Sequence, residues 1–262
     1  MGIIFFFSGV LIFVIGAVYF LQEKLIFLNG NKIDRNHSYN FSNNFEELFL
    51  KTEDGNHINA LHFKLDKPKG IVLFCHGNSG NLDKWGSKVS CFLGFNYEVL
   101  VYDYRGYGKS TGNFSEHEMY ADALLVYNYA KNLFNEERIV VYGFSLGSTF
   151  AVKIAALNKP KEVILEAPFF NLKKAVKYYS KFAPVFLLKY QFRTDLAIVK
   201  VTAPITIFHG NNDTITCFKD AMRLLELNAS STNKFIEING GTHHNIREHS
   251  LYLKCLQKIL ER

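Results

Sequence analysis

Residues 138–157 read RIVVYGFSLGSTFAVKIAAL, and this stretch decides the fold. The apolar run from Arg138 to Phe144 is typical of a strand buried on both faces, and a helical pattern covers Leu146 to Leu157. Between them stands Gly-x-Ser-x-Gly, with Ser145 at its centre. A serine on a tight strand-to-helix turn matches the nucleophile elbow, and the helix start points N–H groups at any developing anion. The pattern predicts Ser145 as a nucleophile.

The same alternation of short apolar runs and helical patterns extends over the body of the chain. It predicts a mostly parallel sheet with helices on both faces, which is an α/β class of fold. An antiparallel hairpin should come first, around the turn Thr-Glu-Asp-Gly-Asn. The expected strands are Glu46 to Lys51, Ile58 to Leu65, Ile71 to Cys75, Glu98 to Tyr104, Arg138 to Phe144, Glu162 to Leu165, Ile205 to Phe208 and Lys234 to Ile238. The expected helices are Leu82 to Leu93, Glu116 to Leu133 with Ser115 as N-cap, Leu146 to Leu157, Phe218 to Leu227 and Ile246 to Leu260.

One segment interrupts this alternation. Residues 169–196, FFNLKKAVKYYSKFAPVFLLKYQFRTDL, are rich in aromatic side chains and lysine and lie between two expected strands. They are too long for a simple crossover. We therefore expect a short helical cap, inserted over the carboxyl ends of the strands.

The amino terminus predicts a membrane anchor. Ile3 to Leu21 carries no charge and is close to the roughly 20 residues that cross a bilayer as a helix. A cleaved signal peptide fits poorly, because no basic residue precedes the run and no small-residue cleavage pattern follows it. Lys24, Lys32 and Arg35 follow it, which favours a single-pass protein with its body on the cytoplasmic side. We expect residues 1–28 to form the transmembrane helix and its flank, and residues 29–262 the globular domain.

Composition limits the remaining function classes. Hydrophobic residues make up 48% and charged residues 21%, which excludes a disordered chain and a multi-span membrane protein. The net charge of +6 comes from dispersed residues, so no nucleic-acid partner is expected. The four cysteines show no metal-ligand spacing, so no metal is expected.

A serine nucleophile needs a base, and the base needs an acid. His243 and His244 both follow the last expected strand, and from the residues alone either can be the base. Asp213 follows the strand Ile205 to Phe208 and is the preferred acid, while Glu166 also ends a strand and is its main rival. Less favoured acids are Asp103, Asp195 and Asp220.

The tetrahedral intermediate of acyl transfer needs two N–H donors. One is expected from Leu146, the residue after the nucleophile. The other is expected from Asn78, in the Gly-containing loop after the strand Ile71 to Cys75. His76, in the same loop, is an alternative base, but we expect it to orient the loop.

Five motifs in this order resemble the α/β-hydrolase superfamily, and within it the membrane-anchored ABHD-type serine hydrolases with a single amino-terminal span. They are HGNSGN at 76–81, DYRGYGKSTG at 103–112, GFSLGS at 143–148, HGNND at 209–213 and GTHHN at 241–245. The catalytic histidine of such proteins is usually followed by Asn, which implies His244, since Asn245 follows it. His243 then stands where relatives have a small residue.

The resemblance implies an α/β-hydrolase fold and a Ser145–His244–Asp213 triad that works without a cofactor. The expected activity is hydrolysis of carboxylic esters or thioesters through an acyl-enzyme. The apolar anchor and cap favour membrane lipids or acylated molecules as substrates. A serine peptidase and a non-catalytic membrane scaffold of the same fold are the alternatives. The sequence predicts no oligomeric state.

Overall fold

The computed structural model describes residues 15–16, 19–28 and 32–261 of the protein. Within them, eight strands form one sheet in the order β1-β2-β4-β3-β5-β6-β7-β8. β1 and β2 form an antiparallel hairpin, β2 is antiparallel to β4, and the remaining neighbours are parallel. The predicted hairpin and the predicted mostly parallel sheet are confirmed. The strands are β1 Phe45–Lys51, β2 His57–Phe63, β3 Gly70–Cys75, β4 Tyr97–Tyr102, β5 Ile139–Phe144, β6 Glu162–Glu166, β7 Ile205–Gly210 and β8 Lys234–Ile238.

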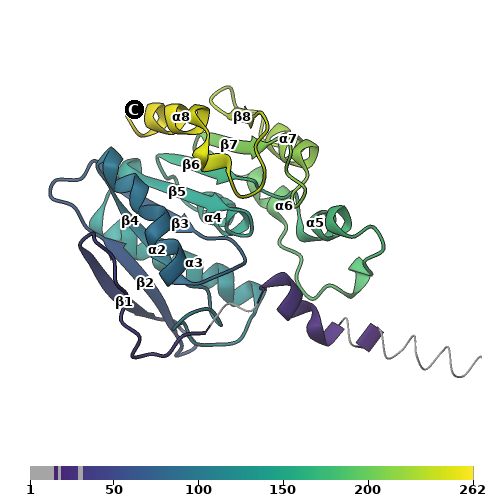
Figure 1. Cartoon of the computed structure of the whole chain (residues 1–262), viewed down its shortest axis with the longest axis horizontal. Helices are drawn as coiled ribbons and strands as arrows, with labels where there is room; N and C mark the ends of the chain where they lie inside the picture. Colours follow the sequence, from purple (N-terminus) through teal and green to yellow (C-terminus); the bar gives the residue numbers. More distant parts are fainter. Residues whose placement is uncertain (1–14, 17–18, 29–31, 262) are drawn as a thin grey trace, which may run out of the picture.

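Helices cover both faces of this sheet (Figure 1). Side chains alternate along each strand, so Ile71 and Leu73 belong to the core beneath α3, α4 and α7, while Val72 and Phe74 belong to the core beneath α2 and α8. The helices are α2 Leu82–Val89, α3 Glu116–Leu133, α4 Gly147–Ala155, α5 Leu172–Tyr179, α6 Thr194–Ile198, α7 Phe218–Glu226 and α8 Ser250–Leu260. Short 3₁₀ turns are η1 Ser90–Phe95, η2 Glu136–Arg138, η3 Val185–Leu187 and η4 Ile246–Glu248.

Most helix positions follow the sequence pattern, and two boundaries differ from it by more than two residues. The Ser115 hydroxyl caps α3 by accepting from the Glu118 N–H, as expected. The helix expected from Ile246 is a 3₁₀ turn first, and α8 begins only at Ser250 because His249 has an extended backbone. The helix expected over Leu82 to Leu93 ends at Val89 and continues as η1.

The expected cap falls between β6 and β7. Residues 169–196 contain α5, η3 and the start of α6, and we call them the cap segment. The hydroxyl of Tyr178, on α5, donates to the backbone carbonyl of Asp213 at 3.0 Å. The cap segment therefore contacts the loop that follows β7. The proposed division of the chain at residue 28 stays a prediction.

The expected transmembrane helix, Ile3 to Leu21, lies mostly outside the described residues. Among those that are described, no helix is both long enough and apolar enough to span a bilayer. Residues 19–26 are helical, and they lie on the same side of the molecule as the cap segment (Figure 1).

Candidate active site

Ser145 occupies the turn between β5 and α4. Its φ of +51° is in the left-handed region, which costs a side-chain-bearing residue energy and marks a tight turn. The flanking glycines make the turn possible. A Cβ on Gly143 would lie 2.6 Å from the Ser148 Cα, and a Cβ on Gly147 would overlap the backbone of Cys75. The nucleophile elbow that the sequence predicts is present.

Ser145, His243 and Asp213 form one hydrogen-bonded chain. The Ser145 Oγ and the His243 Nε2 are 3.0 Å apart, and the His243 Nδ1 and the Asp213 Oδ2 are 2.8 Å apart. All three residues are buried. With Nδ1–H donating to the carboxylate, Nε2 is free to accept the serine proton, which is the tautomer that a general base requires.

The acid is held in its charged form by its own loop. The Asp213 Oδ1 accepts from the backbone N–H groups of Ile215 and Thr216 at 2.7 and 2.8 Å, and the Thr216 hydroxyl donates to Oδ2 at 2.7 Å. Burial by itself would raise the pKa of the Asp213 carboxyl, but the hydrogen bonds from His243 and Thr216 outweigh burial and hold that pKa below its usual range. A carboxylate is therefore available to stabilise an imidazolium.

The histidine in this hydrogen-bonded series is His243, so the sequence-based preference for His244 was wrong. After β8 the loop closes on Asn245, whose side-chain oxygen accepts from the backbone N–H of Thr242 at 2.7 Å and from its hydroxyl at 3.0 Å. This turn directs His243 inward and leaves His244 exposed. Asn245 thus fastens the loop, and its place in the sequence does not identify the base. Partial burial, with the nearby His243 and Lys84, lowers the pKa of His244.

The rival acid Glu166 has another partner. Its Oε2 accepts from the Arg247 guanidinium at 2.6 and 2.7 Å and from the Tyr142 hydroxyl at 2.7 Å. Arg247 belongs to η4, directly after the histidine loop. The pair therefore joins that loop to the end of β6, and Glu166 does not take the role of the triad acid.

The remaining candidate acids also have basic partners. The Asp195 carboxylate receives both arms of Arg193 at 2.9 Å. Asp220 is 2.7 Å from the Nζ of Lys174. The fifth candidate, Asp103, is fully buried and lies 3.3 Å from the Nε2 of His76.

His76 contacts its own loop, which fits the expected orienting role. Its Nδ1 donates to the Gly77 carbonyl at 2.6 Å, and the other ring nitrogen faces Asp103. Burial raises the pKa of the Asp103 carboxyl. The Asp103 carboxylate also accepts from the Leu82 N–H at 3.2 Å, so the pair holds the loop between β3 and α2 in place.

The expected oxyanion donors are the backbone N–H groups of Asn78 and Leu146. Within the described part of the chain, neither N–H donates to another protein atom. The Asn78 side chain donates to the Ile26 carbonyl at 3.0 Å, and the Tyr107 hydroxyl lies 2.9 Å from the Asn78 carbonyl. The loop is thus fixed on two sides while its N–H stays available to a ligand. The oxyanion role of the two amides stays a prediction.

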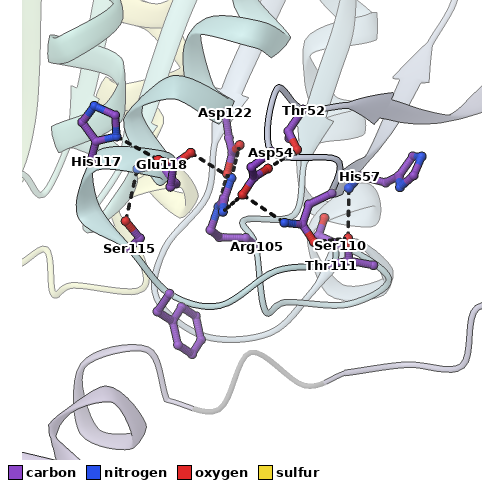
Figure 2. Close-up of polar contacts among 12 residues, drawn as sticks. Thr52, Asp54, His57, Arg105, Ser110, Thr111, Ser115, His117, Glu118 and Asp122 are labelled. Carbon is purple, nitrogen blue, oxygen red and sulfur yellow. Dashed lines mark hydrogen bonds and ion pairs between the residues drawn. The ribbon is translucent and has the colours of Figure 1, made fainter.

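The motif at 103–112 contributes support for the site. Figure 2 shows the Arg105 guanidinium between two carboxylates: it donates to both oxygens of Asp122 on α3 at 2.7 and 2.8 Å, and to Asp54 in the β1–β2 turn at 3.0 Å. The Ser110 hydroxyl donates to the Asp103 carbonyl at 2.7 Å. These bonds hold the segment from which Asp103 contacts residues 76–81, the loop between β3 and α2, which we call the oxyanion loop after its expected role.

Three contacts of the site have no signal in the sequence. Thr216 bonds to the acid, Tyr178 reaches the acid loop from the cap segment, and Ile26 meets Asn78 from the amino-terminal segment. Each joins a residue of a motif to one that belongs to no motif, and two of the three span more than 30 positions of the chain. Only the folded chain shows them.

Two surface hollows lie elsewhere. One is lined by Lys69, Phe95 and Leu260, and the other by His62, Tyr129 and Arg138. Both are at the amino ends of the parallel strands, whereas the triad lies at the carboxyl ends. No group of His, Cys, Asp and Glu side chains that could hold a metal ion occurs among the described residues.

Similarity to known proteins identifies the family of the chain. Residues 66–198, about half of its length, match the family model described as serine aminopeptidase, S33. The chain belongs to this family of α/β hydrolases. Uncharacterized protein R595 of Acanthamoeba polyphaga mimivirus is 32% identical over 227 residues, which cover 77% of this chain and 76% of the relative.

Two further similarities support the assignment. Lysophosphatidylserine lipase ABHD12 of Danio rerio is 26% identical over 80% of this chain and 67% of its own length. An esterase of Pyrococcus furiosus superposes with a TM-score of 0.71 at 18% identity, over 89% of this chain and 96% of the esterase. The resemblance to α/β hydrolases is confirmed at the level of family and fold.

Proposed function

We propose that this α/β hydrolase is a membrane-tethered serine hydrolase that cleaves carboxylic esters or thioesters through an acyl-enzyme. One observation carries the proposal: the hydrogen-bonded chain from Asp213 through His243 to Ser145. A serine hydroxyl is a weak nucleophile without a positioned base, and this base is positioned and has its own acid.

In the proposed reaction Ser145 attacks the acyl carbonyl while His243 takes its proton, and Asp213 stabilises the resulting imidazolium. The N–H groups of Leu146 and Asn78 bind the oxyanion, and loss of one such donor lowers kcat by about 10²–10³-fold. His243 then protonates the leaving group. Water, deprotonated by the same imidazole, attacks the acyl-enzyme and releases the acid.

For the substrate we propose an acyl ester or thioester of a lipid or of an acylated molecule. Tyr178 of the cap segment lies beside the acid loop, Phe169 and Phe170 begin the same segment, and aromatic side chains line pockets for acyl groups. The name of the Danio rerio relative supports the same class. A chain-length series of p-nitrophenyl esters tests it: preference for long acyl chains is expected, and preference for acetyl over every longer chain would count against a lipid pocket.

For location we propose that Ile3 to Leu21 anchors the protein in a membrane, with the catalytic domain on the cytoplasmic side. The uncharged run and the basic residues Lys24, Lys32 and Arg35 after it support this arrangement. Protease added to sealed vesicles carrying the protein is expected to digest the catalytic domain when the cytoplasmic face is outward. Protection of that domain from the protease would indicate the opposite orientation.

The family description makes a serine peptidase the second candidate, since the same groups cleave amides. An aminopeptidase also needs an anion to hold the substrate ammonium. The acids near the triad other than Asp213 already have partners: Glu166 pairs with Arg247, and Asp220 pairs with Lys174. Aminoacyl anilides are therefore expected to be poorer substrates than p-nitrophenyl esters of fatty acids. The reverse order would favour the peptidase.

A fluorophosphonate probe, which reacts with activated serines, tests the proposal as a whole. Wild-type protein should be labelled and Ser145→Ala should not. Ser79→Ala is the matched control, because Ser79 lies in the oxyanion loop and its hydroxyl accepts from Lys84 at 3.1 Å rather than from a residue of the triad. An unlabelled wild type, or equal labelling of Ser145→Ala, would contradict the enzyme and favour a non-catalytic scaffold.

A further inference from the structure

A group of large apolar side chains is exposed on one side of the protein, next to the site. Phe182 is 97% exposed, Phe186 78% and Tyr179 77%, all in the cap segment. Phe20 and Leu25, from the helix over residues 19–26, are 74% and 67% exposed. Soluble proteins rarely leave a contiguous apolar patch of this kind without a partner.

The two segments that carry these side chains are joined to each other. The buried side chain of Gln22 accepts from the Lys189 N–H at 2.7 Å and donates to the Leu187 carbonyl at 3.1 Å. The Tyr190 hydroxyl donates to Glu23 at 2.9 Å. Lys189 lies over the Tyr19 ring at 4.7 Å. The two segments therefore lie side by side (Figure 1), and we call their exposed residues the cap–helix surface.

The two segments carry more basic than acidic side chains. Lys24, Lys181 and Lys189 are exposed on them, with Lys189 at 3.5 Å from Glu23, and within the cap segment Asp195 is the single acidic residue, already paired with Arg193. Exposed aromatic rings beside lysines are typical of elements that lie in the headgroup region of a membrane, because the rings enter the acyl boundary while the ammonium groups meet anionic lipids.

The sequence that precedes the helix over residues 19–26 indicates which partner covers this surface. The helix over residues 19–26 continues the uncharged sequence that begins at Ile3. We propose that the cap–helix surface is a second contact with the same bilayer, in which Phe182 and Phe186 enter the lipid interface. The proposal rests on the anchor proposed above. A bilayer explains both the exposed apolar side chains and the excess of basic ones, whereas a second copy of the chain would bring lysines against lysines.

The surface also connects with the active site. On one side Tyr178 bonds to the Asp213 carbonyl, and on the other the Ile26 carbonyl holds the Asn78 side chain. Contact with the interface at this surface would bring acyl chains to the side of the molecule on which Ser145 lies. The enzyme would then take its substrate from the membrane rather than from water.

Quenching by brominated lipid tests the contact. The full chain is reconstituted into vesicles of phosphatidylcholine and phosphatidylserine in which the phosphatidylcholine carries bromine on its acyl chains. Phe182→Trp adds a reporter, and Leu157→Trp is the matched control, since Leu157 is also exposed but lies between α4 and β6, at the amino ends of the parallel strands and away from the cap segment. The single natural tryptophan, Trp85, is buried and gives the baseline.

We expect the added emission of Phe182→Trp to be quenched and that of Leu157→Trp to be unaffected. If the protein floats with the vesicles but the two reporters respond alike, the second contact is wrong and the anchor stands. If the protein does not float with vesicles, both proposals fail. A response of the reporter to protein concentration without bromine quenching would assign the surface to self-association and also overturn the proposal.

Activity provides a second readout. The double variant Phe182→Asp and Phe186→Asp is expected to hydrolyse a fatty-acyl ester embedded in vesicles about tenfold or more slowly, because two apolar side chains no longer enter the interface. Hydrolysis of water-soluble p-nitrophenyl acetate should be unchanged, since neither residue touches the triad. Equal loss on both substrates would contradict the proposal.

Discussion

At the scale of single residues, the geometry of the triad depends on groups that never meet the substrate. Thr216 donates to the carboxylate of Asp213 with both its N–H and its hydroxyl. Arg247 holds the end of the histidine loop against Glu166, and its guanidinium lies over the Phe74 ring at 4.9 Å and the Tyr142 ring at 5.2 Å. A buried cation placed this way fixes the loop that carries His243.

The ion pair gives a prediction about stability. Arg247→Met should lower the free energy of unfolding by about 3–5 kcal/mol, because it leaves the buried Glu166 carboxylate without its cation. The double variant Glu166→Gln with Arg247→Met should recover much of that loss. Urea denaturation measures both. A single variant as stable as wild type would show that the pair does not fasten the loop.

At the scale of elements, loops at the carboxyl ends of β3, β5, β7 and β8 supply the reactive groups, as open α/β sheets require. A further element takes part. The helix over residues 19–26 ends at the oxyanion loop, where the Ile26 carbonyl, at the last turn of the helix, accepts from the Asn78 side chain. Phe27 then stacks on Phe114 at 4.2 Å between ring centroids.

This contact predicts a kinetic effect. Asn78→Ala keeps the backbone N–H but removes its anchor, so kcat should fall by about tenfold, less than the 10²–10³-fold that follows loss of a whole oxyanion donor. KM should change little, since the effect is on the transition state. Ser79→Ala serves as the neighbouring control. Unchanged kcat in Asn78→Ala would mean that the helix does not position the loop.

The elements that the sequence predicted are those whose signals are local. Helix α3 has the expected bounds because a capping serine and an apolar stripe both lie within it, and the elbow at Ser145 is encoded in five adjacent residues. The choice between His243 and His244 did not depend on a local sequence signal. It depends on how Thr242 and Asn245 turn the loop, and this turn is visible only in the fold.

At the scale of the whole molecule, buried histidines link folding to pH. Burial lowers the pKa of both His62 and His209. Below about pH 6.5, the ordinary value for histidine, the unfolded chain therefore binds protons that the folded chain does not. The stability that depends on keeping these two histidines neutral is fully present above that pH and is lost as the pH falls below it.

The expected result is a lower free energy of unfolding at pH 5.5 than at pH 7.5, measured in urea. His209→Gln should reduce this difference whatever it does to absolute stability, because one of the histidines with a lowered pKa is removed. The carboxylate of Asp213, whose pKa is lowered, adds a contribution that is lost only as the pH falls below about 4. An equal pH dependence in wild type and His209→Gln would rule out this account of His209.

The most direct measurement of the central claim compares two adjacent histidines. The value of kcat/KM for a p-nitrophenyl ester is determined for wild type, His243→Ala and His244→Ala, with urea denaturation confirming that each protein is folded. Since His243 bridges the serine and the acid, its loss should lower kcat/KM by about 10³-fold or more, whereas His244→Ala should stay near wild type. Loss of activity in His244→Ala with His243→Ala active would contradict the account.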